Sequence, residues 1–211
     1  MGNYMTRARR NIIIFDFDGV IIDSFATVFG IWKKVRPQLT EAAYRRQFEG
    51  NINAHLDREQ PATHFDFFAH YGPEVPNQPL VEDIDTIIKD LSQSYTLAIV
   101  SSTISPPIKQ FLQRHGLQQY FAKILGNDVA KSKVQKFQMI LGQYGLSPSQ
   151  AILITDTIGD IREASEVGIQ AIAVTWGYHD EATLRQGNPA AVAASPTELK
   201  KLIAHLLDRG T

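Results

Sequence analysis

Short apolar runs recur along the chain and are rich in β-branched residues. The runs cover residues 12–17, 96–101, 123–126, 151–156 and 171–176. Continuous apolar runs of this length indicate strands that are covered on both faces, as in a parallel sheet. Helical patterns separate the last four runs, and this alternation is typical of βαβ units. The pattern predicts an α/β fold in which helices flank a parallel sheet.

Capping residues, prolines and glycines mark where the intervening helices begin and end. The predicted helices cover about 105–115, 132–144 and 159–167, and a last helix begins near residue 195. The helix over 132–144 is expected to bury one apolar face, formed by Val134, Phe137, Leu141 and Tyr144.

Residues 24–80 interrupt this alternation directly after the first predicted strand. Their apolar positions follow helical rather than alternating spacing, and several prolines divide the segment into short pieces. The segment is expected to form a small helical insert over the carboxyl edge of the sheet. Residues 1–23 and 81–211 would then form the core domain.

Composition and charge narrow the functional classes. Of the 211 residues, 21 are Lys or Arg and 22 are Asp or Glu, so nothing indicates a nucleic-acid or membrane partner. The chain has no cysteine, which excludes disulfides, thiolate metal sites and a cysteine nucleophile. No apolar stretch is long enough to span a bilayer, and the first ten residues lack the apolar region of a signal peptide. A soluble cytoplasmic protein is expected.

Two carboxylates follow the first predicted strand, one residue apart. Asp16 and Asp18 come at its carboxyl end, and Gly19 allows the chain to turn there. In open α/β sheets, ligands bind at this end of the strands. Two close carboxylates repel each other and are costly to desolvate, and a hard divalent cation with oxygen ligands removes that cost.

The sequence D-F-D-G-V-I-I-D-S at residues 16–24 resembles motif I of the haloacid dehalogenase-like (HAD) superfamily. This resemblance implies a Rossmann-like core with a C1-type cap over 24–80. It also implies that Asp16 attacks phosphorus and that Asp18 is the general acid and base.

Two further strand ends match the family. Ser101 ends the second predicted strand, where motif II places a hydroxyl that holds phosphate oxygens. Asp156 ends the fourth strand, and Asp160 follows four residues later, as in motif IV. On residue type alone, Asp160 also suits the first turn of a helix. The resemblance implies a Mg²⁺ ion held by Asp16, the backbone carbonyl of Asp18, and Asp156.

The family also has a lysine at the start of the helix before the fourth strand. Lys131 and Lys133 both fit this position, and counting back from the end of that helix favours Lys131. The proline that often follows this lysine in the family is replaced by Ser132.

The sequences V-T-W-G-Y-H-D and S-P-T-E-L near the chain's end resemble the phosphoglycolate phosphatase-like branch. The implied function is a Mg²⁺-dependent phosphatase that hydrolyses a small phosphorylated metabolite through an aspartyl-phosphate. Phosphomutase-type transfer on a sugar phosphate uses the same core residues, and a non-catalytic phosphate- or partner-binding protein is the alternative of another class. Dehalogenation is disfavoured because it needs neither Asp18 nor a magnesium site.

The predicted insert contains cations and aromatic residues whose roles the sequence leaves open, as it does the oligomeric state. The aromatic cluster of Phe65, Phe67, Phe68 and Tyr71 is interpreted as insert core or a dimer contact rather than a ligand site. Side chains with the charge to contact an anionic substrate are Arg36, Arg45, Arg46, His55, His64 and His70.

Overall fold

A single parallel sheet forms the centre of the molecule. The structure is a computed structural model and describes residues 11–52 and 65–208. Six strands pair in the order β3-β2-β1-β4-β5-β6, and every pair is parallel. The strands are β1 (Ile12–Phe15), β2 (Thr96–Val100), β3 (Phe121–Leu125), β4 (Ala151–Thr155), β5 (Gln170–Val174) and β6 (Ala191–Ala193). The predicted Rossmann-like α/β fold is confirmed.

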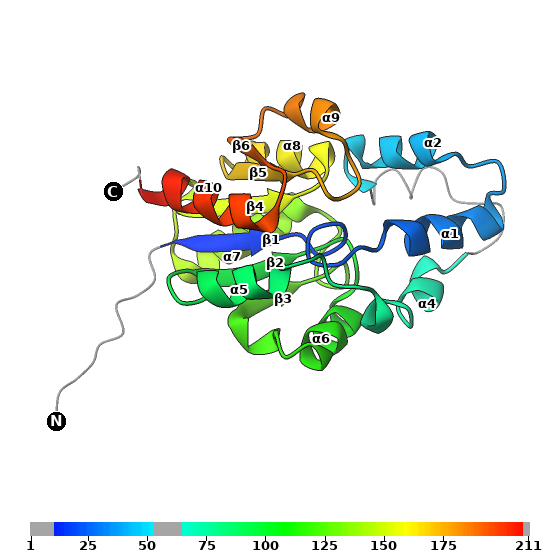
Figure 1. The fold of residues 1–211 in the computed structure, drawn as a ribbon, viewed down its shortest axis with the longest axis horizontal. Helices are drawn as coiled ribbons and strands as arrows, with labels where there is room; N and C mark the ends of the chain where they lie inside the picture. Colours follow the sequence, from blue (N-terminus) through cyan, green and yellow to red (C-terminus); the bar gives the residue numbers. More distant parts are fainter. Residues whose placement is uncertain (1–10, 53–64, 209–211) are drawn as a thin grey trace.

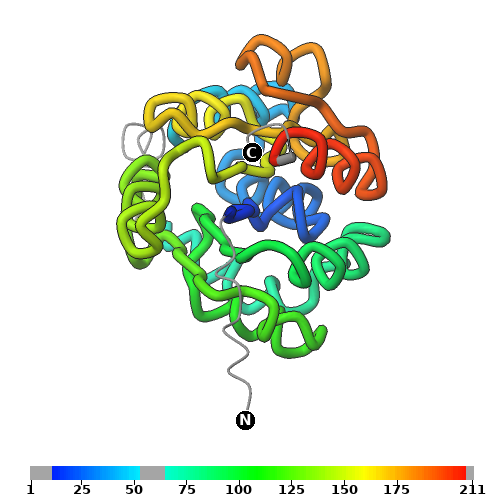
Figure 2. Tube along the Cα trace, turned by 90° about the vertical axis from the view of Figure 1, so that its left-hand side faces the viewer, coloured from blue at the N-terminus to red at the C-terminus, as the bar shows by residue number. Residues whose placement is uncertain are grey.

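Helices cover both faces of this sheet (Figure 2). One face packs against α5 (Ile84–Leu91), α6 (Ser105–Arg114) and α10 (Pro196–Asp208). The other packs against α7 (Lys133–Tyr144), α8 (Ile158–Glu166) and α9 (Glu181–Arg185).

The central strand β1 explains why its sequence is apolar throughout. Ile13 and Phe15 belong to the core cluster on the first face, whereas Ile12 and Ile14 belong to the cluster on the second. All four side chains are fully buried, because successive residues of a strand point to opposite faces.

The insert lies beyond the carboxyl ends of the strands (Figure 1). Its described elements are α1 (Phe25–Val35), α2 (Glu41–Arg46), the 3₁₀ turn Gln47–Glu49, α4 (Phe67–Tyr71) and the 3₁₀ turn Val75–Asn77. The chain leaves and re-enters the core through adjacent segments. Asp23 N donates to Pro79 O at 3.0 Å, and Val81 N donates to Ile21 O at 3.0 Å.

Several boundaries differ from those expected. The predicted strands extend one or two residues too far at their carboxyl ends, so Asp16, Ser101 and Asp156 lie just past the strands. The pattern did not predict β6, α5 or α9, which are short or lie beside the insert. No helix of the described residues combines the length and apolar character needed to cross a membrane.

The buried face of α7 also differs from the prediction. Phe137 is buried as expected, but Val134 and Leu141 are only partly buried. The face consists of Lys133, Lys136, Phe137 and Ile140. Two lysines take positions that the apolar pattern assigned to neighbouring residues.

Candidate active site

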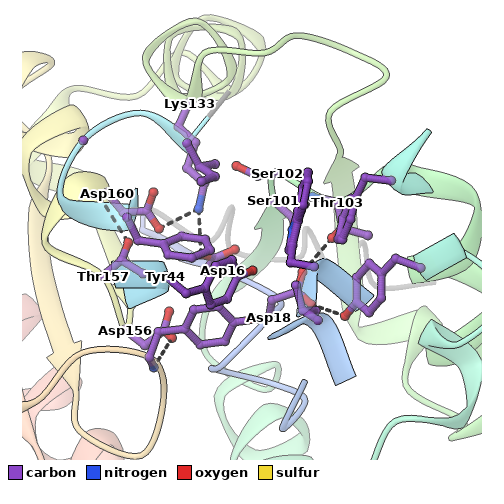
Figure 3. Close-up of a pocket in the computed structure, with 18 of the residues that line it drawn as sticks. Asp16, Asp18, Tyr44, Ser101, Ser102, Thr103, Lys133, Asp156, Thr157 and Asp160 are labelled. Carbon is purple, nitrogen blue, oxygen red and sulfur yellow. Dashed lines mark hydrogen bonds and ion pairs between the residues drawn. The ribbon is translucent and has the colours of Figure 1, made fainter. Parts of the chain in front are cut away.

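Three strand ends meet where the order of the strands reverses. Strand β1 lies between β2 and β4, so the residues that follow these strands gather at one edge of the sheet. Asp16, Ser101 and Asp156 line one cavity there (Figure 3). A reversal of strand order at the carboxyl edge is the usual ligand site of open α/β sheets.

Lys133 connects two of the carboxylates in this cavity. Its Nζ lies 2.7 Å from Asp16 Oδ2 and 2.6 Å from Asp160 Oδ2 (Figure 3). Lys131 is exposed and is absent from the cavity lining. The structure therefore places Lys133, rather than the preferred Lys131, at this cavity. Ser132 caps α7, which makes Lys133 the first helical residue and turns its side chain towards the sheet.

The charges of this group depend strongly on burial. Desolvation raises the pKa of Asp16 well above its usual value, although Lys133 acts in the opposite direction. Burial opposes ionisation of Lys133, but attraction by Asp16 and Asp160 outweighs it and raises the lysine pKa. Burial opposes ionisation of Asp160 too, yet Lys133 and hydrogen bonds lower its pKa to about 2. One lysine therefore faces two carboxylates, with Asp156 as a third nearby acid.

Asp156 has one bound oxygen and one without a partner. Its Oδ2 accepts a hydrogen bond from Tyr178 N at 2.7 Å. Its Oδ1 is buried and has no hydrogen-bond partner among the described residues. Burial raises the pKa of Asp156 to about 7. An unpaired oxygen of a buried carboxylate needs a cation or a proton.

Two glycines approach this carboxylate closely. A Cβ built on Gly19 would lie 2.0 Å from Asp156 Oδ2, and one on Gly177 would lie 2.3 Å from it. Gly19 also has a φ of +72°, which L residues with a side chain rarely adopt. Any larger residue at either position would displace the Asp156 side chain.

The predicted magnesium ligands fit a hard cation by chemistry. Asp16 and Asp156 supply carboxylate oxygens, and the orphaned Oδ1 of Asp156 is available to a ligand. A group of three or more acidic or histidine side chains able to hold a metal is absent from the part of the chain that the structure describes. The predicted magnesium ligands include only two side chains, those of Asp16 and Asp156, and the third predicted ligand is the backbone carbonyl of Asp18.

Asp18 is held by hydroxyl groups from the core and the insert. Thr103 Oγ1 donates to Asp18 Oδ2 at 2.7 Å, and Tyr71 OH donates to Asp18 Oδ1. Thr103 follows β2, whereas Tyr71 is the last residue of α4. The sequence did not single out Thr103 and assigned Tyr71 to the insert core, because neither contact follows from local spacing.

Ser101 and Ser102 line the cavity beside these groups. Ser101 Oγ accepts from Thr103 N at 3.0 Å, which leaves its own proton free to donate. Ser101 O accepts from Lys136 Nζ at 2.5 Å. Burial and the neighbouring Lys133 lower the pKa of Lys136 to about 8. Sequence reasoning missed Lys136, although its spacing of three from Lys133 places both on one helix face.

Polar contacts join the insert to the core around the cavity. Asn51 Nδ2 donates to Glu163 Oε1 at 2.8 Å, and the same oxygen accepts from Lys133 N at 3.1 Å.

His179 forms a second contact between the core and the insert. Burial lowers the pKa of His179, which indicates a neutral ring. Its Nδ1 accepts from Ile158 N, so its Nε2 donates to Arg45 O.

The aromatic side chains of the insert reach the cavity. Phe67, Phe68 and Tyr71 all line it, so their interpretation as insert core without a ligand surface is incomplete. The sequence left open whether six charged residues of the insert contact the substrate. The four of them that the structure describes are absent from the lining; these are Arg36, Arg45, Arg46 and His70. His55 and His64 lie outside the described residues.

Comparison with known proteins identifies the family. The model of the haloacid dehalogenase-like hydrolase family matches residues 13–174, and the chain belongs to this family. A phosphoglycolate phosphatase from Synechococcus elongatus is 28% identical over 92% of this chain and 98% of the relative. Another from Vibrio parahaemolyticus is 24% identical over 95% of this chain and 99% of the relative. A haloacid dehalogenase-like hydrolase structure from Streptococcus pneumoniae has the same fold, with a TM-score of 0.77, 24% identity and coverage of 92% and 98%.

The predicted family and enzyme class are confirmed. The chain is a HAD-type hydrolase, and both of the curated relatives named above are phosphoglycolate phosphatases.

Proposed function

We propose that this enzyme is a Mg²⁺-dependent phosphatase that hydrolyses a small phosphomonoester through an aspartyl-phosphate on Asp16. The observation that carries the proposal is the convergence of Asp16, Lys133 and the half-unpaired Asp156 on one buried cavity. The names of the curated relatives favour a phosphorylated small molecule as the substrate.

Asp16 is the proposed nucleophile. Its carboxylate attacks phosphorus, and the bond between phosphorus and the ester oxygen breaks as the new bond forms. Lys133 Nζ lies 2.7 Å from Asp16 Oδ2 and favours the ionised carboxylate, which opposes the effect of burial on the Asp16 pKa. The hydrogen bond from Phe17 N to Asp16 Oδ1, at 2.7 Å, fixes the side chain further.

Asp18 is the proposed general acid and base. It protonates the leaving alcohol and then takes a proton from the water that hydrolyses the phosphoenzyme. Thr103 and Tyr71 hold its two oxygens, so the insert contributes to the position of the acid.

The transferring phosphoryl group needs donors for its equatorial oxygens. The Ser101 hydroxyl, the Ser102 N–H and Lys133 line the cavity and are suited to this role. Lys136 supports the Ser101 carbonyl and so positions this loop.

Asp16, the Asp18 carbonyl and Asp156 are the proposed magnesium ligands. When bound, the ion offsets the repulsion between the phosphate dianion and the carboxylates. When Asp16, Asp156 and Asp160 are all ionised, they carry two more negative charges than Lys133 balances, and a bound dication would offset this excess.

Residues 24–80 are the proposed cap, and residues 1–23 and 81–211 the core. The paired segments around Ile21 and Pro79 support these boundaries, because both chain crossings occur there. A cap in this position excludes bulk water from the first chemical step.

Phosphate release from ethyl phosphate and phosphoglycolate tests the proposal. Asp16→Asn should reduce the rate at least ~10³-fold, since it removes the nucleophile. Asp23→Asn is the matched control, because Asp23 is exposed and outside the cavity. EDTA should stop the reaction and added Mg²⁺ should restore it. An Asp16→Asn variant with wild-type turnover would refute the nucleophile.

A further inference from the structure

The cavity has two chemically distinct parts. The polar part holds the carboxylates, Lys133 and the Ser101–Ser102 turn at the edge of the sheet. The opposite part, here called the apolar wall, comes from the insert and consists of Val28, Trp32, Phe48, Ile52, Phe67 and Phe68. A phosphate bound on the polar part therefore directs its alcohol group towards the apolar wall.

The apolar wall presents aromatic surface. Trp32 and Phe67 stack with ring centroids 5.3 Å apart and an interplanar angle of 7°. Trp32 also contacts Phe65 at a centroid distance of 5.2 Å, which fixes its ring from a second direction. Rings held in this way form a preorganised surface for an apolar or planar group.

Among the described residues, the lining offers no cation besides Lys133 for a second negative charge on the substrate. Within residues 11–52 and 65–208, Lys133 is the one cationic side chain that lines the cavity, and Asp16 and Asp160 already pair with it. The Arg45 guanidinium lies 3.7 Å from the Phe25 ring centroid and donates to Tyr178 O. A carboxylate placed against the apolar wall would lose its hydration without gaining a cationic partner among the described residues.

We propose that the enzyme prefers phosphomonoesters of uncharged alcohols that carry an aromatic or branched aliphatic group. This inference deepens the proposed function, because it assumes that phosphate binds on the polar part of the cavity. It differs from the substrate in the names of the curated relatives, since phosphoglycolate carries a carboxylate where this cavity has its apolar wall.

Binding of phosphonates tests the preference without turnover. Three ligands share a three-carbon chain: 3-phenylpropylphosphonate, propylphosphonate and 3-phosphonopropionate. Calorimetric titration in magnesium buffer should give a Kd for the phenyl compound about tenfold or more below that of propylphosphonate. The carboxylate compound should bind about tenfold or more weakly than propylphosphonate.

A matched pair of variants locates the effect. Phe67→Leu should reduce the advantage of the phenyl ligand over propylphosphonate several-fold. Phe29→Leu is the control, because Phe29 is a partly buried aromatic residue of the same insert that does not line the cavity. The wild-type series decides the matter even if a variant fails to fold.

The outcomes separate this inference from the phosphatase proposal. A protein that binds 3-phenylpropylphosphonate most tightly but hydrolyses no ester supports the inference and refutes the proposed reaction. A protein that hydrolyses esters but binds 3-phosphonopropionate as tightly as propylphosphonate, or tighter, overturns the inference alone. Equal binding of the phenyl and propyl ligands also overturns it.

Discussion

Replacing Asp156 by Asn should change stability in a direction that depends on pH. Burial raises the pKa of this carboxyl from 3.8 to about 7 in the folded protein. Because the folded pKa lies above the unfolded one, the group's contribution to stability is complete below pH 3.8. It is lost as the pH rises towards 7. In metal-free buffer, the wild type therefore carries an uncompensated buried charge at pH 8.

The magnitude follows from the difference between the two pKa values. At about 1.4 kcal/mol for each tenfold step in proton affinity, ionisation of Asp156 costs ~4 kcal/mol at pH 8 and ~2 kcal/mol at pH 5. Asn removes this cost and can still accept from Tyr178 N. It also places an amide N–H₂ at the unpaired Oδ1 position, which costs about 1–3 kcal/mol at either pH. The variant should gain ~1–3 kcal/mol at pH 8 and little or nothing at pH 5.

Magnesium should remove most or all of the stability advantage of the variant at pH 8. At 100 times its Kd, a ligand specific for the folded state adds ~2.7 kcal/mol to the wild type, and the variant should gain much less. Urea unfolding at 25 °C, followed by tryptophan fluorescence, measures the free energy of unfolding of the wild type and of the variant, each in EDTA and in Mg²⁺. The reasoning fails if the variant is less stable than the wild type in EDTA at pH 8, or if Mg²⁺ stabilises both proteins equally.

Three other predictions concern residues around the same cavity. Lys133→Gln leaves buried carboxylates unpaired and should cost ~3–5 kcal/mol of stability together with most activity. Lys131→Gln should change neither stability, measured by urea unfolding, nor activity, measured by phosphate release. Tyr71→Phe should slow turnover of ethyl phosphate about 10–100-fold but spare 4-nitrophenyl phosphate, whose leaving group needs no proton; equal losses on both would remove Tyr71 as a positioning residue. Asn51→Ala should raise KM more than it lowers kcat, because it weakens the contact of the insert with Glu163; an unchanged KM would contradict this.

The sequence predicted the strands and the site residues that directly follow them, because both depend on patterns among neighbouring residues. The apolar run of β1 indicated a strand buried on both faces, and the parallel order of the strands brings Asp16, Ser101 and Asp156 together. The sequence could identify these three residues because each directly follows a predicted buried strand. The third strand, which begins at Phe121 rather than 123, shows that boundaries are less well determined than the presence of an element.

The sequence could not distinguish Lys131 from Lys133 for a physical reason. The preference for Lys131 came from counting back from the end of the predicted helix, and lysine side chains are usually exposed, so burial of Lys133 was not expected. Two carboxylates stabilise Lys133 in the interior, and that compensation comes from Asp16 and Asp160 elsewhere in the chain. Helical phase alone, with Lys133 in line with Lys136 and Ile140, would have indicated the buried face.

The contacts of Tyr71 were beyond sequence reasoning for a different reason. Tyr71 reaches Asp18 across 53 residues, through an insert whose placement over the sheet no local pattern specifies. The same placement brings Phe67 and Phe68 to the cavity lining.

Trapping the phosphorylated enzyme shows directly whether Asp16 attacks phosphorus. Asp18→Ala enzyme, mixed with Mg²⁺ and 4-nitrophenyl phosphate, whose leaving group needs no proton, and quenched in acid, should retain one phosphoryl group on the peptide that contains Asp16. Peptide mass spectrometry after borohydride reduction should detect the reduced product at residue 16. Substrate turnover by the wild type without any label on Asp16 in the variant, or with label on another residue, would contradict the account.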